Sequence, residues 1–218
     1  MLLKEIKEIL GGDVSTKNSK MPGTSFGLST DYCNVGGKLR AIEGSVCSKC
    51  YAERLEKFRP SVKKGWTRRA DAILSATEND DGMEAWQNAM VERLKKLKPS
   101  HHRWHDSGDL LNFNHLQMIA VVARSCPEIS FWIPTKERAL IKRFKKWYKV
   151  PDNLTIRVSA AQVGDKLSHE ENSSMVFNDR LGHPDDIWAC PAKHQGGTCA
   201  NCRACWDKSI KIVGYPLH

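Results

Sequence analysis

Segments typical of strands alternate with segments typical of helices in the second half of this 218-residue chain. Two stretches, "ISFWIPTK" and "LTIRVSAAQ", place apolar residues at every second position, as a strand with one buried face does. A basic helix, "KERALIKRFKKWYK", is expected between them. Strands that alternate with helices favour a parallel sheet. Sites in such sheets form just beyond the carboxyl ends of the strands.

The remaining segments extend this pattern over a single domain, residues 1–218. "HHRWHDSGDLL" predicts a short strand that ends in a polar loop, "SFGLS" is a candidate strand, and "DIWAC" and "IKIVGYP" are candidate last strands. Helical spacing of apolar residues predicts helices in residues 2–10, 51–57, 63–77, 82–98 and 112–126, with Pro60 as a breaker. A long polar loop is expected over residues 162–185.

Charge and composition bound the class of protein. The net charge of +9 and the sequence pI near 9.2 favour an anionic partner such as nucleic acid, although a solvated basic surface explains them equally well. No segment is apolar for long enough to span a bilayer, so no membrane partner is expected. Lysines and glutamates interrupt the start, "MLLKEIKEILGG", which is therefore not a signal peptide. We expect a cytoplasmic protein, in which eight cysteines favour metal binding or catalysis over disulfides.

The stronger cysteine signal lies near the C-terminus, in "CPAKHQGGTCANCRACW". A run with cysteine at every third position, together with one more cysteine, is typical of a [4Fe–4S] cluster, while zinc usually takes two separated Cys-x-x-Cys pairs. Gly196 and Gly197 would let the chain bend closely around a cluster. The candidate ligands are Cys190, Cys199, Cys202 and Cys205, with zinc as the alternative metal.

A second group precedes the first long helices and has three cysteines, Cys33, Cys47 and Cys50. Three thiolates on a cubane cluster leave one iron open to a substrate or a cofactor. The alternatives are a zinc site closed by His101, His102 or His105, or a single cluster that draws ligands from both groups. Cys126 stands apart and is expected to be structural.

Four short stretches carry a family resemblance. "CSKCYA", "RWHDSGDLLNF", "FWIPTK" and "IRVSA", in that order and followed by the terminal cysteines, resemble the phage-encoded gene 88 protein family. More distantly, they resemble the radical S-adenosylmethionine (SAM) superfamily. The resemblance runs from about Asn18 to the end. It implies an α/β fold, a partial (β/α) barrel of about six mostly parallel strands with a C-terminal cluster-binding loop.

The same resemblance implies roles for residues at the strand ends. The segment "SGDLL" occupies the place of the segment that binds the SAM amino group, and it includes Ser107, Gly108 and Asp109. The Asp109 carboxylate would accept a hydrogen bond from the SAM ammonium group. Thr135, in "PTK", would follow the third strand, and Arg157 and Ser159 would lie near the SAM carboxylate and ribose. The thirteen residues between Cys33 and Cys47 depart from the superfamily's much shorter spacing.

The sequence therefore leaves three alternative functions. The first is an iron–sulfur protein with one or two [4Fe–4S] clusters that cleaves SAM reductively, with an electron donor as partner, in the host cytoplasm if phage-encoded. The second is a SAM-independent sulfur-transfer enzyme that uses the open iron. The third is an iron–sulfur or zinc protein that binds nucleic acid without catalysis, through the basic helix near residues 136–149.

Overall fold

The computed structural model describes residues 1–16, 18–167, 172–179 and 182–217. Within these residues, seven strands form one sheet in the order β1-β2-β3-β4-β5-β7-β6, and every neighbouring pair is parallel. The strands are β1 (Thr24–Phe26), β2 (His101–Trp104), β3 (Ser130–Thr135), β4 (Leu154–Ser159), β5 (Ser173–Phe177), β6 (Trp188–Ala189) and β7 (Ile212–Pro216). The sheet is open rather than closed into a barrel.

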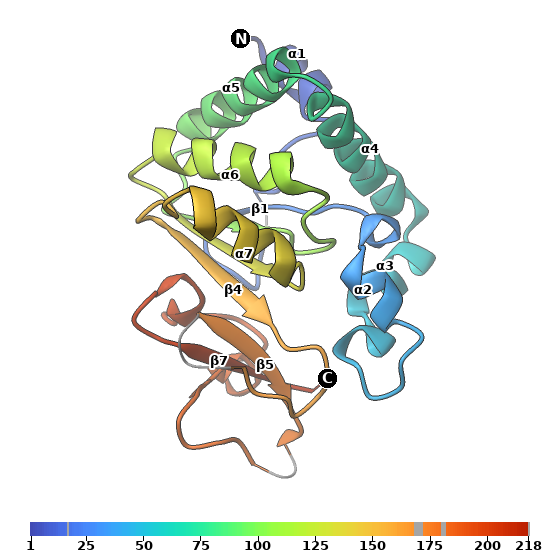
Figure 1. Cartoon of the computed structure of the whole chain (residues 1–218), viewed down its shortest axis with the longest axis vertical. Helices are drawn as coiled ribbons and strands as arrows, with labels where there is room; N and C mark the ends of the chain where they lie inside the picture. Colours follow the sequence, from blue (N-terminus) through green and yellow to red (C-terminus); the bar gives the residue numbers. More distant parts are fainter. Residues whose placement is uncertain (17, 168–171, 180–181, 218) are drawn as a thin grey trace.

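Helices account for most of the chain before β4 (Figure 1). They are α1 (Leu3–Ile9), α2 (Val35–Leu39), α3 (Tyr51–Phe58), α4 (Pro60–Ala76), α5 (Asp80–Leu97), α6 (Phe113–Ser125) and α7 (Arg138–Trp147). Asn112 caps α6, because its side chain accepts a hydrogen bond from the backbone N–H of His115 at 2.8 Å. Pro60 opens α4 instead of only ending α3, since a proline in the first helical turn loses no backbone hydrogen bond.

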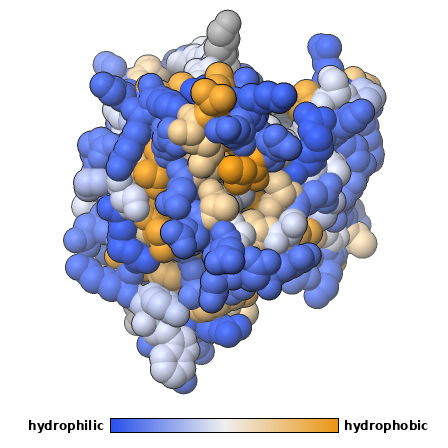
Figure 2. Space-filling model, turned by 90° about the horizontal axis from the view of Figure 1, so that it is seen from above, coloured by the Kyte–Doolittle hydropathy of each residue, from blue (hydrophilic) through white to orange (hydrophobic). Residues whose placement is uncertain are grey.

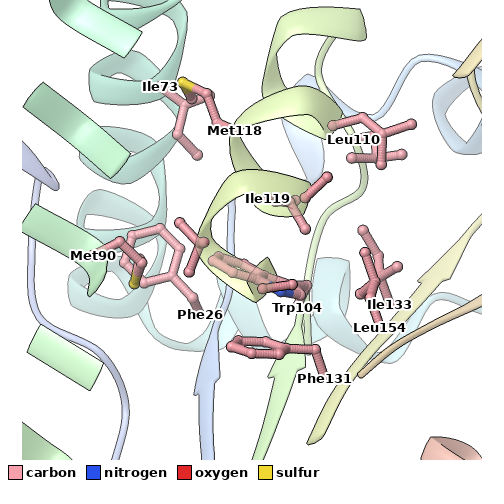
Figure 3. Close-up of a cluster of buried hydrophobic side chains, with 14 of the residues drawn as sticks. Phe26, Ile73, Met90, Trp104, Leu110, Met118, Ile119, Phe131, Ile133 and Leu154 are labelled. Carbon is pink, nitrogen blue, oxygen red and sulfur yellow. The ribbon is translucent and has the colours of Figure 1, made fainter. Parts of the chain in front are cut away.

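The main core lies between the sheet and the long helices. Phe131, Ile133 and Leu154 point from β3 and β4 toward α6, as the alternating pattern predicted. Figure 3 shows Met90 and Met118 closing the same core from the helices. These side chains are fully buried or nearly so, and their burial is the main stabilising contribution of the fold.

The opposite face of the sheet is covered by the C-terminal segment. Trp132 points to this face and packs with Trp206, whose indole N–H donates to the carbonyl oxygen of His102 at 3.1 Å. Trp206 belongs to a short 3₁₀ helix, η5 (Ala204–Trp206), that includes Cys205. The cysteine-rich segment therefore packs directly on the sheet.

Two expectations for the fold need correction. The sheet has seven strands among the described residues, not about six, because β5 lies inside residues 162–185, where a loop was expected. The sequence of β5, "SSMVF", hides the strand because Ser173 and Ser174 are polar yet buried. The candidate strand near "SFGLS" is β1, shifted toward the N-terminus.

The surface is mostly polar. On the face seen in Figure 2, hydrophilic residues dominate and hydrophobic ones show between them. In the described part of the chain, no helix combines the length and the apolar character that crossing a bilayer requires.

Candidate metal centre

The three N-terminal cysteines are free thiols held by short turns. Cys33 ends the 3₁₀ helix η1 (Thr30–Tyr32), and Cys50 ends η2 (Val46–Lys49) and begins α3. Gly36 leaves room between two of them, because a Cβ there would lie 3.4 Å from both Cys33 Cβ and Cys47 Sγ. All three thiols are half-buried. The turns bring these cysteines to one part of the structure, and their role as metal ligands stays a prediction.

The thiol pKa values show which charges lie near this group. Burial raises the pKa of Cys33 to about 12, with smaller contributions in the same direction from Asp109 and the neighbouring thiols and an opposing one from Arg40. Burial also raises the pKa of Cys47, and the ammonium of Lys136 opposes that shift. Arg40 and Lys136 are therefore the cations that favour the thiolate forms, which metals bind.

The end of β3 holds the cysteine segment in place. The Lys136 Nζ donates to the carbonyl oxygen of Ala160 at 2.6 Å, beyond the end of β4. The buried Glu137 accepts from the backbone N–H of Val35 at 2.9 Å, two residues after Cys33. These contacts put the N-terminal cysteines at the carboxyl edge of the sheet, where a site in a parallel sheet is expected.

Asp109 and Thr135 contact each other at this edge. One carboxylate oxygen of Asp109 accepts from the Thr135 hydroxyl at 2.6 Å and from the backbone N–H of Leu110 at 2.7 Å. The other accepts from the backbone N–H of Lys136 at 2.8 Å. Burial raises the pKa of Asp109 to about 6, which these three hydrogen bonds oppose. The carboxylate therefore ties β2 to β3, and its expected contact with an ammonium stays a prediction.

The rest of the "HDSGD" loop is tightly packed. Gly108 has a φ of +81°, and a Cβ there would lie 2.7 Å from Leu28 Cβ, so glycine is required. The Ser107 hydroxyl and one oxygen of Asp106 are buried and have no hydrogen-bond partner in the described structure. Asp106 Oδ1 would lie 2.6 Å from a Cβ at Gly27. An unpartnered carboxylate oxygen thus belongs to Asp106, not to Asp109.

Arg157 points from β4 to the C-terminal segment. Its guanidinium is completely buried and donates to carbonyl oxygens of the C-terminal segment, at 3.0 Å to Cys205, 2.7 Å to Ala204 and 2.7 Å to Asp207. Further bonds go to Ile210, Lys211 and Ser173. Arg157 therefore organises the cysteine-rich segment, and its expected contact with SAM stays a prediction. Ser159 pairs with Ser174 at 3.1 Å between their hydroxyl oxygens.

The C-terminal cysteines are also free thiols that lie near one another. Burial raises the pKa of Cys199, and Cys190 and Cys202 raise it further. Cys205 is buried, with its sulfur 3.1 Å from the Tyr215 hydroxyl, and burial raises its pKa to about 11. Backbone bonds fix the ends of the segment, from Cys190 to Gly214 and from Cys199 to Lys20, each at 2.8 Å.

Among the described residues, no three histidine, cysteine or acidic side chains lie close enough together to hold one metal ion. Four thiolates around a single zinc would lie roughly 3.8 Å apart, given a Zn–S distance of about 2.3 Å. A cubane cluster binds each thiolate on a different iron, so its ligands stand farther apart. The choice between a [4Fe–4S] cluster and zinc for these thiols therefore stays a prediction.

The histidines proposed to close a zinc site pack against tryptophan rings. His102 and His105 are buried in the main core, and the ring of His101 packs against Trp206. His105 donates from Nδ1 to the carbonyl oxygen of Phe26 at 3.3 Å, so its Nε2 is a bare acceptor in the neutral ring. Burial lowers the pKa of His102 and of His105 to about 3. The rings of His102 and His105 therefore stay neutral.

One comparison with known proteins decides the family. The family model described as Gene product 88 matches residues 1–208. The chain belongs to this family. The match covers both cysteine groups and confirms the resemblance to the gene 88 proteins, while the more distant resemblance to radical SAM enzymes stays a prediction. No curated protein and no solved structure matches the chain.

Proposed function

We propose that this member of the Gene product 88 family is an iron–sulfur protein. Cys33, Cys47 and Cys50 would bind one [4Fe–4S] cluster, and the C-terminal cysteines Cys190, Cys199, Cys202 and Cys205 would bind a second. The observation that carries the proposal is the group of three neighbouring free thiols at the carboxyl edge of a parallel sheet, beside Lys136.

The activity we propose is reductive cleavage of SAM. A cluster on three cysteines would supply an open iron to chelate SAM and an electron to cleave it. The chain's own part is to hold the thiolates near Arg40 and Lys136 and to offer polar groups at the strand ends. The buried, unpartnered oxygen of Asp106 is a better candidate than Asp109 to accept from the SAM ammonium.

Electron paramagnetic resonance tests this proposal on anaerobically purified protein reduced with dithionite. We expect SAM to perturb the cluster signal and to be cleaved, and we expect Asp106→Asn to weaken both effects more than Asp109→Asn does. An unperturbed signal with intact SAM contradicts the proposed activity. Sulfur transfer through the open iron would then be the remaining enzymatic proposal.

A nucleic-acid partner is the second candidate, and charge supports it. The chain carries 34 lysines and arginines against 25 acidic residues. In that proposal the metals would only stabilise the loops. Salt-dependent binding of nucleic acid without any effect of SAM would favour it.

A further inference from the structure

Positive charge is concentrated around the N-terminal cysteines. Residues 36–69 hold ten lysines and arginines and three glutamates, so this segment contributes +7 to a chain with a net charge of +9. Two of the three cysteines lie inside it, and the third is three residues before it. A charge of this size beside a candidate site favours an anionic ligand.

Most of these cations are not neutralised. Lys57 pairs with Glu53 at 2.9 Å and Lys63 pairs with Asp31 at 2.7 Å. Arg40 lies 3.9 Å from Glu53, and Arg69 donates to the carbonyl oxygens of Gly27 and Asp13. The other six are exposed and make no ion pair within the part of the chain that the structure describes: Lys38, Lys49, Arg54, Arg59, Lys64 and Arg68. They lie on α2, at the end of η2, on α3, in the link to α4 and on the first half of α4. Phosphate groups are the natural partners of such a set.

One face of α3 adds exposed rings to this charge. Tyr51, Arg54, Leu55 and Phe58 follow one another at helical spacing and therefore share a face. Phe58 is 81% exposed and Tyr51 is 52% exposed. An arginine between two exposed aromatic rings can contact phosphate while the rings stack on bases.

Tyr51 links this face to the cysteines. It follows Cys50 directly, and its hydroxyl donates to the carbonyl oxygen of Asp106 in the loop after β2. Burial raises the pKa of this hydroxyl, although the residue as a whole is 52% exposed. A base stacked on Tyr51 would thus lie one residue from the candidate metal ligand.

We propose that the face of α3 formed by Tyr51, Arg54, Leu55 and Phe58 binds single-stranded nucleic acid, with Lys49, Arg59 and Lys64 on its phosphates. This names the substrate class of the proposed enzyme and rests on that proposal. A single strand fits because its bases are free to stack on Tyr51 and Phe58. A membrane surface fits less well, because α3 has only 8 residues and Arg54 interrupts its apolar face.

The basic helix α7 provides the matched control. It is exposed and basic too, and it ends in the exposed Trp147. Because α7 leads from the end of β3 to the start of β4, Trp147 lies at the amino edge of the sheet, opposite the cysteines. If nucleic acid were attracted only by the overall positive charge, substitutions on α3 and on α7 would weaken binding equally.

Fluorescence anisotropy of a labelled oligouridylate or oligothymidylate of about 20 nucleotides, titrated with the anaerobic protein at several salt concentrations, tests the proposal. Arg54→Gln with Arg59→Gln should reduce the slope of log affinity against log salt by about 1.4, or about 0.7 for each lost phosphate contact. Phe58→Ala should weaken binding about tenfold. Lys142→Gln with Lys146→Gln, and Trp147→Ala, should change binding far less.

Equal losses from the α3 and α7 variants would overturn the proposal, and so would binding to phosphatidylserine vesicles without binding to the oligonucleotides. Phe58 and Arg54 are exposed, so the two α3 variants should leave the unfolding temperature unchanged. A loss of binding in them then reports lost contacts and not unfolding. The visible spectrum of the same samples reports cluster content. Oligonucleotide binding by protein without a cluster would contradict only the proposed enzyme.

Discussion

The guanidinium Nε of Arg157 donates to the carbonyl oxygen of Cys205 at 3.0 Å, across the face of the sheet that the long helices leave open. The same guanidinium contacts five other carbonyl oxygens. One buried cation on β4 therefore fixes the path of the segment that contains Cys199, Cys202 and Cys205. The C-terminal cysteines depend on the sheet as much as on any metal.

Replacing Arg157 with methionine should destabilise the protein strongly. The change keeps most of the side-chain volume but leaves buried carbonyl oxygens without donors, which costs about 3 kcal/mol or more in the free energy of unfolding. Urea unfolding measures the loss. Arg138→Met, at an exposed position on α7, is the control and should change the free energy by less than about 0.5 kcal/mol. Similar losses for both variants would contradict the role of Arg157.

A double-mutant cycle should find Asp109 and Thr135 coupled. Their side chains are 2.6 Å apart at the ends of adjacent strands, and both are buried. We expect a coupling free energy of about 1 kcal/mol or more between Asp109→Asn and Thr135→Val, measured by urea unfolding. Additive losses would mean that this hydrogen bond does not tie β2 to β3.

The histidines of the core should make the protein sensitive to acid. Burial lowers the pKa of His102, His105 and His115 below their ordinary value of 6.5. Between that value and the folded pKa of about 3 for His102 and His105, the unfolded state binds more protons. Stability should therefore be constant above pH 6.5 and fall as the pH drops below it, by at most about 1.4 kcal/mol per pH unit for each histidine.

The titration of Asp109 offsets only part of this loss of stability toward acid pH. Its folded pKa of about 6 lies above the ordinary 3.8, so its own contribution decreases as the pH rises between these values. Three histidines outweigh one carboxyl group. Urea unfolding between about pH 5 and pH 7.5 should show the loss toward acid, and His115→Gln should make it shallower. Stability that is flat or rises toward acid would contradict neutral buried histidines.

Periodicity of apolar residues predicted most of the fold. The strands β3 and β4 alternate apolar residues because one of their faces packs on α6 and α7, and that pattern is visible in the sequence. β5 escaped detection because it has buried serines. Its partner β7 supplies backbone hydrogen bonds that no local pattern reveals.

The candidate site was predictable only in its cysteines. Their spacing indicates two groups, and in the structure Cys33 and Cys199 each have neighbouring thiols of their own group. Metal binding by either group stays a prediction. The roles of Asp109 and Arg157 could not be read from the sequence, because their partners are backbone groups and a threonine distant in the chain. Tertiary packing alone shows that the oxygen left without a partner is on Asp106.

The most direct test of the central claim is the iron and acid-labile sulfide content of anaerobically purified protein, read with its visible spectrum. We predict iron and sulfide in equal amounts, about four of each per cluster, with charge-transfer absorbance. Replacing Cys33, Cys47 and Cys50 together with alanine should remove the iron and sulfide of one cluster. Cys126→Ala, in the main core, should remove none. Zinc at one or two equivalents without that absorbance would contradict the account.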